Sequence, residues 1–309
     1  MRLTASVSYG AVIDRCCLVD DTDWTRLVAQ LERGHCTPFL GAGACVGVLP
    51  TGGDLSEQWA AEYEYPFEDR RELPRVMQWA ATTMADPVFV RERLADALVD
   101  TGPPDFDDPV EPHRLLADLP LPLYLTTNYD DFMIQALSHA GRRPRTAICP
   151  WYLGVEHGVD LRSDDVAPTS EEPVVYHLHG SFRDPRSMVV TEDDHLEFLI
   201  RLAMDRAAAR QRIIPPYVLE ALATRPLLFL GYSLRDWTFQ VLFRGLLRAV
   251  SPVQHRRHVS VQLPPLSATA DGQVRARTEK FLTRHLNHLN VSVYWGTADE
   301  FCRELRRRL

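Results

Sequence analysis

Short apolar runs alternate with longer segments of helical periodicity along most of the chain. Several of the runs are apolar without interruption, which is typical of strands that are buried on both faces of a sheet. Strands alternating with helices indicate a parallel sheet covered by helices on both sides. We therefore predict an α/β fold with a Rossmann-like parallel sheet. The predicted strands are Thr37–Leu40, Leu121–Thr127, Val174–Leu178, Pro226–Leu230, His258–Leu263 and Val291–Trp295.

Apolar residues at three- and four-residue spacing predict the helices between these strands. We expect an N-terminal arm over residues 1–20 and one α/β domain over residues 21–309. Within this domain we expect a helical insertion at roughly 55–112 and a second helical segment at roughly 190–225. The first predicted helix starts at Asp23 and ends at Gly34. The others are Leu55–Tyr63, Glu72–Leu98 with a break at Pro87, His113–Leu116, a segment through Phe132 and Leu137, Leu196–Ala209, Pro216–Thr224, Trp237–Val250 and Ala298–Leu309.

Composition and charge exclude several classes of protein. The 309 residues are 45% hydrophobic and 25% charged, as in an ordinary globular protein. The net charge of −8 argues against a nucleic-acid binder, because phosphate recognition needs a basic surface. There is no apolar run of 18 residues and no apolar stretch typical of a secretion signal near the N-terminus, so we expect a cytoplasmic protein without a membrane span. Lys280 is the only lysine, which excludes a Walker A motif.

The six cysteines do not predict a metal centre. None of them forms a C-x-x-C pair, and no two pairs stand at the spacing of a zinc ribbon. Cys45 lies close to a glycine-rich turn, but we interpret it as a small buried thiol. The prediction is a chain without a bound metal.

Four of the predicted strands end in a glycine-rich or polar turn. Ligands of open parallel sheets bind outside the carboxyl ends of the strands, so these turns are expected to line one crevice. This convergence is the strongest indication of a binding site that the pattern gives. The turns are Gly41-Ala42-Gly43, Thr127-Asn128-Tyr129-Asp130, His179-Gly180-Ser181 and Gly231-Tyr232-Ser233.

The first turn has two interpretations. A Gly-Ala-Gly sequence between a strand and a helix can bring backbone N–H groups close to a phosphate. Glycines in such a turn can equally serve close packing, and the pattern does not separate the two. A full G-x-G-x-x-G fingerprint would need glycine in place of Val46, so an ordinary dinucleotide dehydrogenase is not indicated.

The polar turns also have structural interpretations. Either Asn128 or Asp130, taken alone, is more simply a cap of the following helix. His177 lies inside a strand and is interpreted as a structural histidine. His179 stands at the end of that strand, and because an imidazole titrates near neutral pH it is the better candidate for proton transfer.

In order and spacing, the four turns are similar to those of the sirtuin fold. Sirtuins carry T-Q-N-I-D where this chain has Thr126-Thr127-Asn128-Tyr129-Asp130, and H-G-S/T where it has His179-Gly180-Ser181. The chain resembles more closely the prokaryotic SIR2-like domains of antiphage defence systems, from about Val28 to about Leu247. Those domains typically hydrolyse NAD+ to nicotinamide and ADP-ribose, and the resemblance implies this activity.

The resemblance also implies a role for each matched residue. Asn128 would hold the nicotinamide ribose or the attacking water, and His179 would act on a ribose hydroxyl as a general base. The glycine turn would line the pyrophosphate, and Asp130 would face the nicotinamide carboxamide. Gly231 and Ser233 would lie near the adenosine end. The full set expected to bind NAD+, which is a substrate here, is Gly41, Ala42, Gly43, Thr127, Asp130, Gly231 and Ser233.

The chain departs from the sirtuin pattern in three places. Thr127 replaces the glutamine of the sirtuin motif, and residues 49–54 replace the proline-aspartate-phenylalanine-arginine segment that follows the glycine turn. No cysteine lies between His179 and Gly231, where protein deacylases usually carry a zinc ribbon. We expect a small helical insertion in its place, as in the defence-type domains.

Three functions remain open at this stage. The first is an NAD+ glycohydrolase, and the second is an NAD-dependent protein deacylase, against which the missing zinc ribbon counts. The third is a catalytically silent nucleotide sensor or assembly subunit. Since an uncontrolled NAD+ hydrolase would deplete its own cell, we expect control by homo-oligomerisation or by a separate partner protein. Residues 1–20 and the terminal helix, with Phe301, Leu305 and Leu309 on one face, are candidate contacts, although packing on the sheet is the simpler role for that helix.

Overall fold

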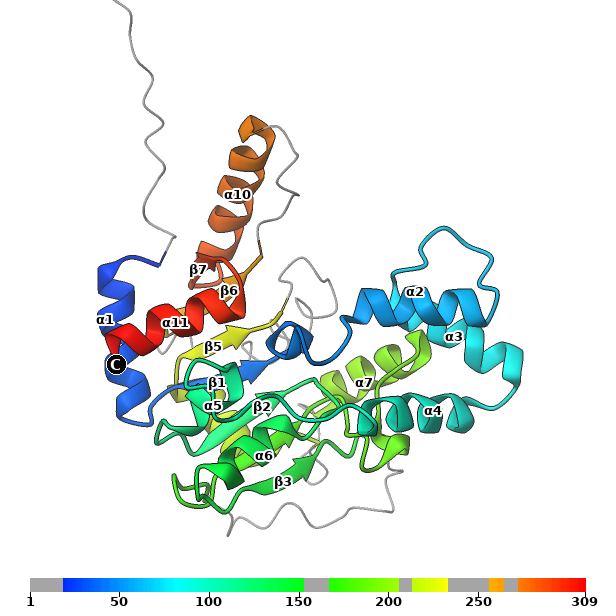
Figure 1. Ribbon diagram of the computed structural model, residues 1–309, viewed down its shortest axis with the longest axis horizontal. Helices are drawn as coiled ribbons and strands as arrows, with labels where there is room; N and C mark the ends of the chain where they lie inside the picture. The colour runs from blue at the N-terminus through cyan, green and yellow to red at the C-terminus, as the bar shows by residue number, and fades with distance from the viewer. Residues whose placement is uncertain (1–18, 153–166, 206–212, 233–255, 264–271) are drawn as a thin grey trace, which may run out of the picture.

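A computed structural model of the chain describes residues 19–152, 167–205, 213–232, 256–263 and 272–309 (Figure 1). Its centre is a seven-stranded sheet with the order β3-β4-β2-β1-β5-β6-β7, and every pair of neighbours is parallel. The predicted Rossmann-like α/β fold is confirmed. The strands are β1 (Thr37–Leu40), β2 (Leu123–Thr126), β3 (Arg145–Ile148), β4 (Val174–His177), β5 (Leu227–Leu230), β6 (His258–Gln262) and β7 (Val291–Trp295).

Helices cover both faces of the sheet, as the uninterrupted apolar strands predict. Successive side chains of a strand point to opposite faces, so Phe229 joins the core on one face while Leu228 and Leu230 join the core on the other. The helices are α1 (Asp21–Glu32), α2 (Gly52–Glu62), α3 (Leu73–Met84), α4 (Pro87–Val99), α5 (Pro112–Ala117), α6 (Phe132–His139), α7 (Glu192–Asp205), α8 (Pro216–Thr224), α10 (Gly272–Asn287) and α11 (Ala298–Arg308), with short 3-10 turns η2 (Ala42–Cys45) and η3 (Pro185–Ser187).

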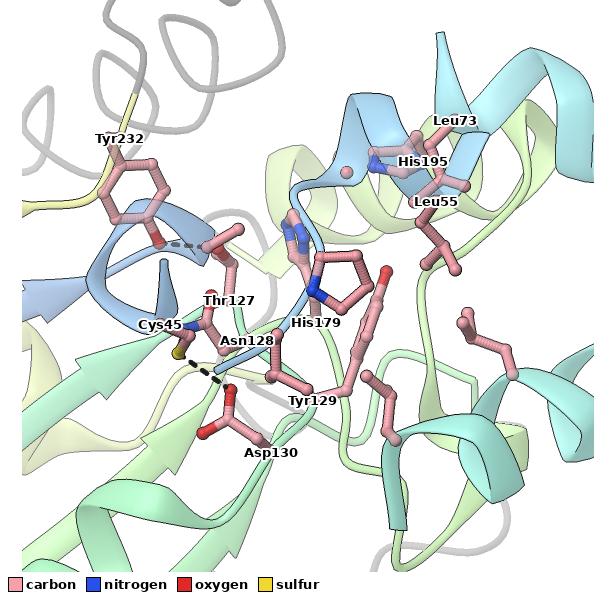
Figure 2. A pocket seen from close by; sticks show the side chains of 16 residues that line it. Cys45, Leu55, Leu73, Thr127, Asn128, Tyr129, Asp130, His179, His195 and Tyr232 are labelled. Carbon is pink, nitrogen blue, oxygen red and sulfur yellow. Dashed lines mark hydrogen bonds between the residues drawn. The ribbon is translucent and has the colours of Figure 1, made fainter. Parts of the chain in front are cut away.

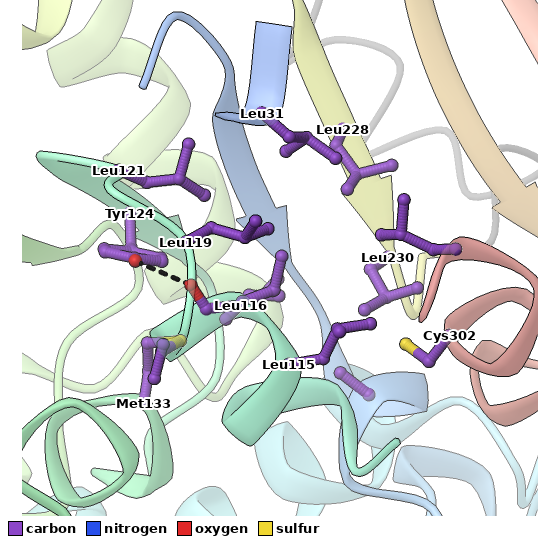
Figure 3. Packing of buried hydrophobic residues seen from close by; sticks show 14 of the residues in the cluster. Leu31, Leu115, Leu116, Leu119, Leu121, Tyr124, Met133, Leu228, Leu230 and Cys302 are labelled. Carbon is purple, nitrogen blue, oxygen red and sulfur yellow. Dashed lines mark hydrogen bonds between the residues drawn. The ribbon is translucent and has the colours of Figure 1, made fainter. Parts of the chain in front are cut away.

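One of the two sheet cores is formed with α1, α5, α6 and α11 (Figure 3). Leu31, Leu116 and Leu230 are buried in it, and Cys302 of α11 lies against the same cluster. The Tyr124 hydroxyl donates to the backbone carbonyl of Leu116 at 3.0 Å, which satisfies the one polar atom that this tyrosine brings into the core. This core fixes β1, β2 and β5, whose carboxyl ends carry three of the four turns.

Helices α2, α3 and α4 form a separate apolar cluster beside the sheet (Figure 1). The sequence dictates the break between α3 and α4: Ala85 adopts a left-handed conformation, and Asp86 accepts hydrogen bonds from the backbone N–H groups of Val88 and Phe89. Pro87 occupies the first position of α4, where its missing N–H costs nothing. These helices occupy much of the segment predicted as the helical insertion, and they enclose part of the cavity described below.

The structure adds two elements that the pattern did not predict. Strand β3 is an edge strand with half of its residues exposed, so it lacks the apolar run by which the other strands were recognised. Helix α10 is largely polar, and its few apolar positions were not recognised as a helical repeat. The predicted helix Trp237–Val250 and most of the predicted arm lie outside the described residues.

The C-terminal helix α11 packs on the sheet. Phe301 and Leu305 are fully buried, whereas Leu309 remains partly exposed. The helix begins with a capping box, in which Thr297 and Glu300 each bond to the other's backbone N–H. Among the described residues, no helix combines the length and the apolar character that a membrane span needs.

Candidate functional site

The four turns lie at the carboxyl ends of four neighbouring strands, β4, β2, β1 and β5. The chain builds the sheet in one direction from β1 through β2 and β4, and then places β5 on the other side of β1. Such a reversal of strand order opens a crevice at the carboxyl ends. The turns therefore converge, as their sequence positions predict.

A cavity of about 210 Å³ lies at this edge of the sheet (Figure 2). Its polar wall comes from the turns after β1, β2 and β4, and its apolar wall comes from α2, α3 and α4 through Leu55, Leu73 and Leu94. Helices α2, α3 and α4 thus close a site whose polar groups belong to the turns of the sheet. Residues predicted as site residues that line the cavity are Ala42, Thr127, Asn128, Asp130 and His179.

Asn128 is buried at the end of β2, and its orientation is fixed from two sides. Its backbone N–H donates to the Thr126 hydroxyl at 2.9 Å, and its side-chain amide donates to Cys45 Sγ at 3.3 Å. The carbonyl of Asn128 also accepts a hydrogen bond from His177 Nδ1 at 3.2 Å. His177 therefore supports the turn, which agrees with its interpretation as a structural histidine.

His179 lines the cavity at the end of β4, next to His195 of α7 (Figure 2). Its ring packs edge-on against Phe198 and His195, at centroid distances of 5.0 and 5.5 Å. Its Nε2 is shielded from solvent and has no hydrogen-bond partner among the described residues. Burial, followed by the charge of His195, holds the pKa of His179 well below its usual value, so the ring is neutral at neutral pH. A neutral imidazole in a binding cavity is available as a proton acceptor.

Asp130 has both a structural and a site-facing role. One carboxylate oxygen accepts from the backbone N–H of Phe132 at 3.1 Å and so supports the turn that leads into α6, whose N-cap is Asp131. The other oxygen accepts from the Cys45 thiol at 3.4 Å, inside the cavity wall. The contact with the turn before α6 therefore does not remove Asp130 from the site.

The glycines of the turns after β1 and β5 are required because the two backbones touch. A Cβ on Gly43 would lie 2.8 Å from the Cα of Gly231, and a Cβ on Gly231 would lie 2.2 Å from the backbone nitrogen of Ala44. Gly231 also has a φ of +83°, which a side chain disfavours. The N–H groups of Gly41 and Gly43 donate to the carbonyls of Leu230 and Gly231. Of the two interpretations of Gly-Ala-Gly, close packing is thus observed, and contact with a pyrophosphate stays a prediction.

A second cavity, of about 660 Å³, lies on the other side of these glycines. Gly43 and Gly231 line it, together with the carboxyl ends of β6 and β7 and the first residues of α11. Tyr232 lines both cavities, so the two are neighbours at this side chain. Gly231 therefore lies at the larger cavity, while Ser233, predicted beside it, lies outside the described residues.

Several residues of the site were not singled out as site residues from the sequence. Tyr232 stands inside a recognised turn, but an aromatic residue there gives no chemical signal by itself. His195 comes from α7, which contributes none of the strand-end turns. Cys45 is buried as expected, yet it contacts both Asn128 and Asp130. Only the fold brings these residues to the cavity.

Comparison with protein families shows to which family the chain belongs. The family model for a SIR2-like domain matches residues 122–287, which is more than half of the chain. The chain belongs to the SIR2-like domain family. The matched segment begins just before β2 and includes the turns that carry Asn128 and His179.

Curated relatives of this SIR2-like protein carry the name NAD(+) hydrolase ThsA. One from Acinetobacter baumannii is 25% identical over 92% of this chain and 55% of its own length. One from Enterococcus faecium is 30% identical over 68% of this chain and 40% of its own length, and one from Bacillus cereus is 24% identical over 60% and 35%. The chain therefore spans between about a third and just over half of the curated relatives it matches.

Proposed function

We propose that this SIR2-like protein is an NAD+ glycohydrolase, which cleaves NAD+ to nicotinamide and ADP-ribose. The observation that carries the proposal is the meeting of two cavities at Tyr232, with Asn128 and His179 in the wall of the smaller one. NAD+ is itself a molecule of two halves joined by a pyrophosphate. The name of the relatives, NAD(+) hydrolase, supports the same activity.

In this proposal the nicotinamide riboside half occupies the smaller cavity and the adenosine half the larger. The pyrophosphate crosses the turns of Gly41, Ala42, Gly43 and Gly231 between them. Thr127 and Asp130 contact the nicotinamide end, with the Asp130 carboxylate accepting from the carboxamide N–H. The apolar side chains of α2, α3 and α4 exclude water from the nicotinamide ring. An apolar environment destabilises the positively charged pyridinium, and so favours its departure as neutral nicotinamide.

The reaction needs little acid catalysis, because the leaving group is neutral. The bond between ribose C1′ and the pyridinium nitrogen breaks, and its electron pair neutralises that nitrogen. Water then forms a bond to C1′ and releases a proton. The protein must stabilise the oxocarbenium-like ribose and direct the water. Asn128 suits the second task because an amide both donates and accepts, and His179 accepts a proton from a ribose hydroxyl or the water.

Analysis of the products of NAD+ tests this proposal. Purified protein incubated with NAD+ alone should release nicotinamide and ADP-ribose in equal amounts. Release only when an acyl-lysine peptide is present, with loss of its acyl group, would instead identify a deacylase. Binding of NAD+ or ADP-ribose without cleavage, at all protein concentrations and also after candidate partner proteins are added, would identify a nucleotide sensor.

Control of the activity is part of the proposal. The chain would act as a NAD-depleting defence effector whose cleavage depends on homo-oligomerisation or on a separate partner protein. The expected cytoplasmic location fits this role, because NAD+ is found there. A concentration series distinguishes assembly, which raises the specific activity, from a missing partner, which leaves it constant.

A further inference from the structure

Three buried side chains from distant parts of the sequence meet at the wall of the smaller cavity, where two of them line the cavity. Cys45 follows the turn after β1, His113 lies in α5, and Asp130 follows β2. Cys45 Sγ is 3.4 Å from Asp130 Oδ2 and 3.9 Å from His113 Nε2. One potential ligand atom from each residue lies within 4.8 Å of the other two.

The distances fit a tetrahedral metal ion. With bonds of about 2.3 Å to sulfur and about 2.0–2.1 Å to nitrogen or oxygen, neighbouring ligand atoms of tetrahedral zinc lie roughly 3.5 Å apart. The two measured distances from Sγ lie within about half an ångström of this value. The third pair, His113 and Asp130, lies within 4.8 Å, so the three ligand atoms need to approach one another by about an ångström or less.

The second nitrogen of His113 is held in the way that metal-bound histidines are held. Its Nδ1 is 2.7 Å from Glu111 Oε1, so the ring presents Nε2 to Cys45. A carboxylate behind a histidine fixes the ring and makes its other nitrogen a better ligand. Glu111 is itself fixed, because its second oxygen accepts from the backbone N–H of Arg114 at 2.6 Å.

We propose that Cys45, His113 and Asp130 form a binding site for a thiophilic divalent cation of the Zn²⁺ type. The thiol loses its proton when the cation binds, and the freed oxygen of Asp130 becomes the third ligand. Without a cation, that deprotonation would place a thiolate against a carboxylate in a buried position. The cation replaces the proton between them, and a water molecule from the neighbouring cavity fills the fourth position.

A nucleophilic cysteine fits the same residues less well. The thiol donates to Asp130, at a shorter distance than separates it from the ring of His113. Burial and the Asp130 carboxylate both raise the pKa of Cys45, which is the opposite of what an activated nucleophile needs. A bound cation would stabilise the thiolate form of Cys45, whereas a nucleophilic cysteine would remain protonated in this environment.

Occupation of the site would slow the cleavage of NAD+, a consequence that rests on the proposed function. The Asn128 amide donates to Cys45 Sγ and would be held more firmly by a metal-bound thiolate. Asp130 would be engaged as a ligand and no longer free for the nicotinamide carboxamide. The metal is therefore an inhibitor here, and it takes no part in the reaction.

No sequence pattern indicated this site, and the prediction of a chain without a bound metal came from cysteine spacing alone. The ligands are separated by 68 and 85 positions from Cys45, so no spacing rule covers them. The indication of this site is structural. Three buried atoms that can bind a metal lie close together, and a carboxylate contacts the second nitrogen of the histidine.

Titration with Co²⁺ tests the site without reference to NAD+. The chelator-treated protein should bind one equivalent, with the near-ultraviolet charge-transfer absorption of a cobalt–thiolate bond, and Zn²⁺ should abolish that absorption. Cys45→Ser should remove the absorption, and His113→Gln should weaken binding at least about 100-fold. Glu111→Gln, which preserves the shape of the group, should weaken binding about 10- to 100-fold. Cys36→Ala, at another buried cysteine, should bind Co²⁺ as the wild type does.

Absence of a cobalt–thiolate band in the folded wild type, or its persistence in Cys45→Ser, would overturn the proposal. Zn²⁺ should also inhibit nicotinamide release by the wild type, with recovery on chelation, and Glu111→Gln should need about 10- to 100-fold more Zn²⁺. Cobalt binding in a protein that never cleaves NAD+ would refute the proposed function and leave the metal site standing. NAD+ cleavage without any cobalt binding would refute the metal site and leave the proposed function standing.

Discussion

The hydroxyl of Tyr232 lies 2.6 Å from the hydroxyl of Thr127 (Figure 2). The tyrosine donates to the carbonyl of Leu40 at 2.8 Å and therefore accepts from the threonine. These bonds join the turn after β5 to the end of β1 and the turn after β2. They hold together the point at which the two cavities meet.

A double-mutant cycle measures this connection. Thr127→Val should lower the free energy of unfolding by about 1 kcal/mol, because it removes the part-buried hydrogen bond to Tyr232. Tyr232→Phe should lower it by about 2 kcal/mol, because it removes that bond and the bond to the Leu40 carbonyl. The double variant should lose less than the sum, with a coupling energy of at least about 0.5 kcal/mol. Denaturant unfolding of the four proteins gives the result. Strict additivity would mean that the two hydroxyls do not interact in solution.

Alanine at Gly231 should damage the fold far more than alanine at an open glycine. The added Cβ would lie 2.2 Å from a backbone nitrogen at a φ of +83°, and strain and overpacking together should cost about 3 kcal/mol or more. Gly141 is the matched control, since its φ is +78° but no atom lies within 4 Å of the added Cβ. Gly141→Ala should cost about 1 kcal/mol. Equal losses in thermal or denaturant unfolding would contradict the packing of the two turns.

The neutral state of His179 has a consequence for stability at acid pH. Burial lowers the pKa of His179, and of His177, below the usual value of 6.5. Above pH 6.5 neither the folded nor the unfolded state holds these protons, so this contribution to stability is complete. As the pH falls below 6.5, the unfolded state takes up protons that the folded state excludes, and stability declines.

Urea unfolding at pH 7.5 and 5.5 measures this decline. Each histidine contributes at most about 1.4 kcal/mol per pH unit in the affected range. His179→Gln should therefore lose less stability on acidification than the wild type. An equal dependence on pH in the two proteins would show that His179 titrates in the folded state as it does in the unfolded chain.

Two substitutions in the terminal helix α11 test whether its apolar face packs on the sheet or contacts another protein. Leu305 is fully buried, so Leu305→Ala should cost about 2–5 kcal/mol. Leu309 is 39% exposed, and Leu309→Ala should change stability by less than about 0.5 kcal/mol. Thermal unfolding of both variants tests the assignment. A Leu305→Ala variant of unchanged stability would return this face to the candidate contacts.

The fold could be predicted largely from apolar runs and turn residues. Strands buried on both faces, such as Leu227–Leu230, carry an unmistakable pattern because every position faces a core. The edge strand Arg145–Ile148 could not be recognised, since half of its residues face solvent. The start of α7 was also predicted too late: the helix begins at Glu192 and not at Leu196, because its first turn is acidic and carries no apolar residue.

The residues of the candidate site, like the elements of the fold, fall into those that the sequence predicts and those that only the structure reveals. Residues at strand ends, such as Asn128 and His179, could be predicted because parallel strands bring their carboxyl ends to one edge. Tyr232 and His195 gave no separate signal, and the grouping of Cys45 with His113 depends on the packing of α5 against the sheet. A sequence records which residues end a strand, whereas the neighbours of a buried side chain follow from the three-dimensional packing.

Release of nicotinamide from NAD+ by purified protein tests the central claim most directly. We would measure it over a series of protein concentrations for the wild type, Asn128→Ala and His179→Ala, with His139→Gln as a control at a histidine away from the cavity. The wild type and the control should release nicotinamide, and the two site variants should lose about 10²- to 10⁴-fold in rate while remaining folded. Undiminished release by either folded site variant would contradict the assignment of Asn128 and His179 to the reaction.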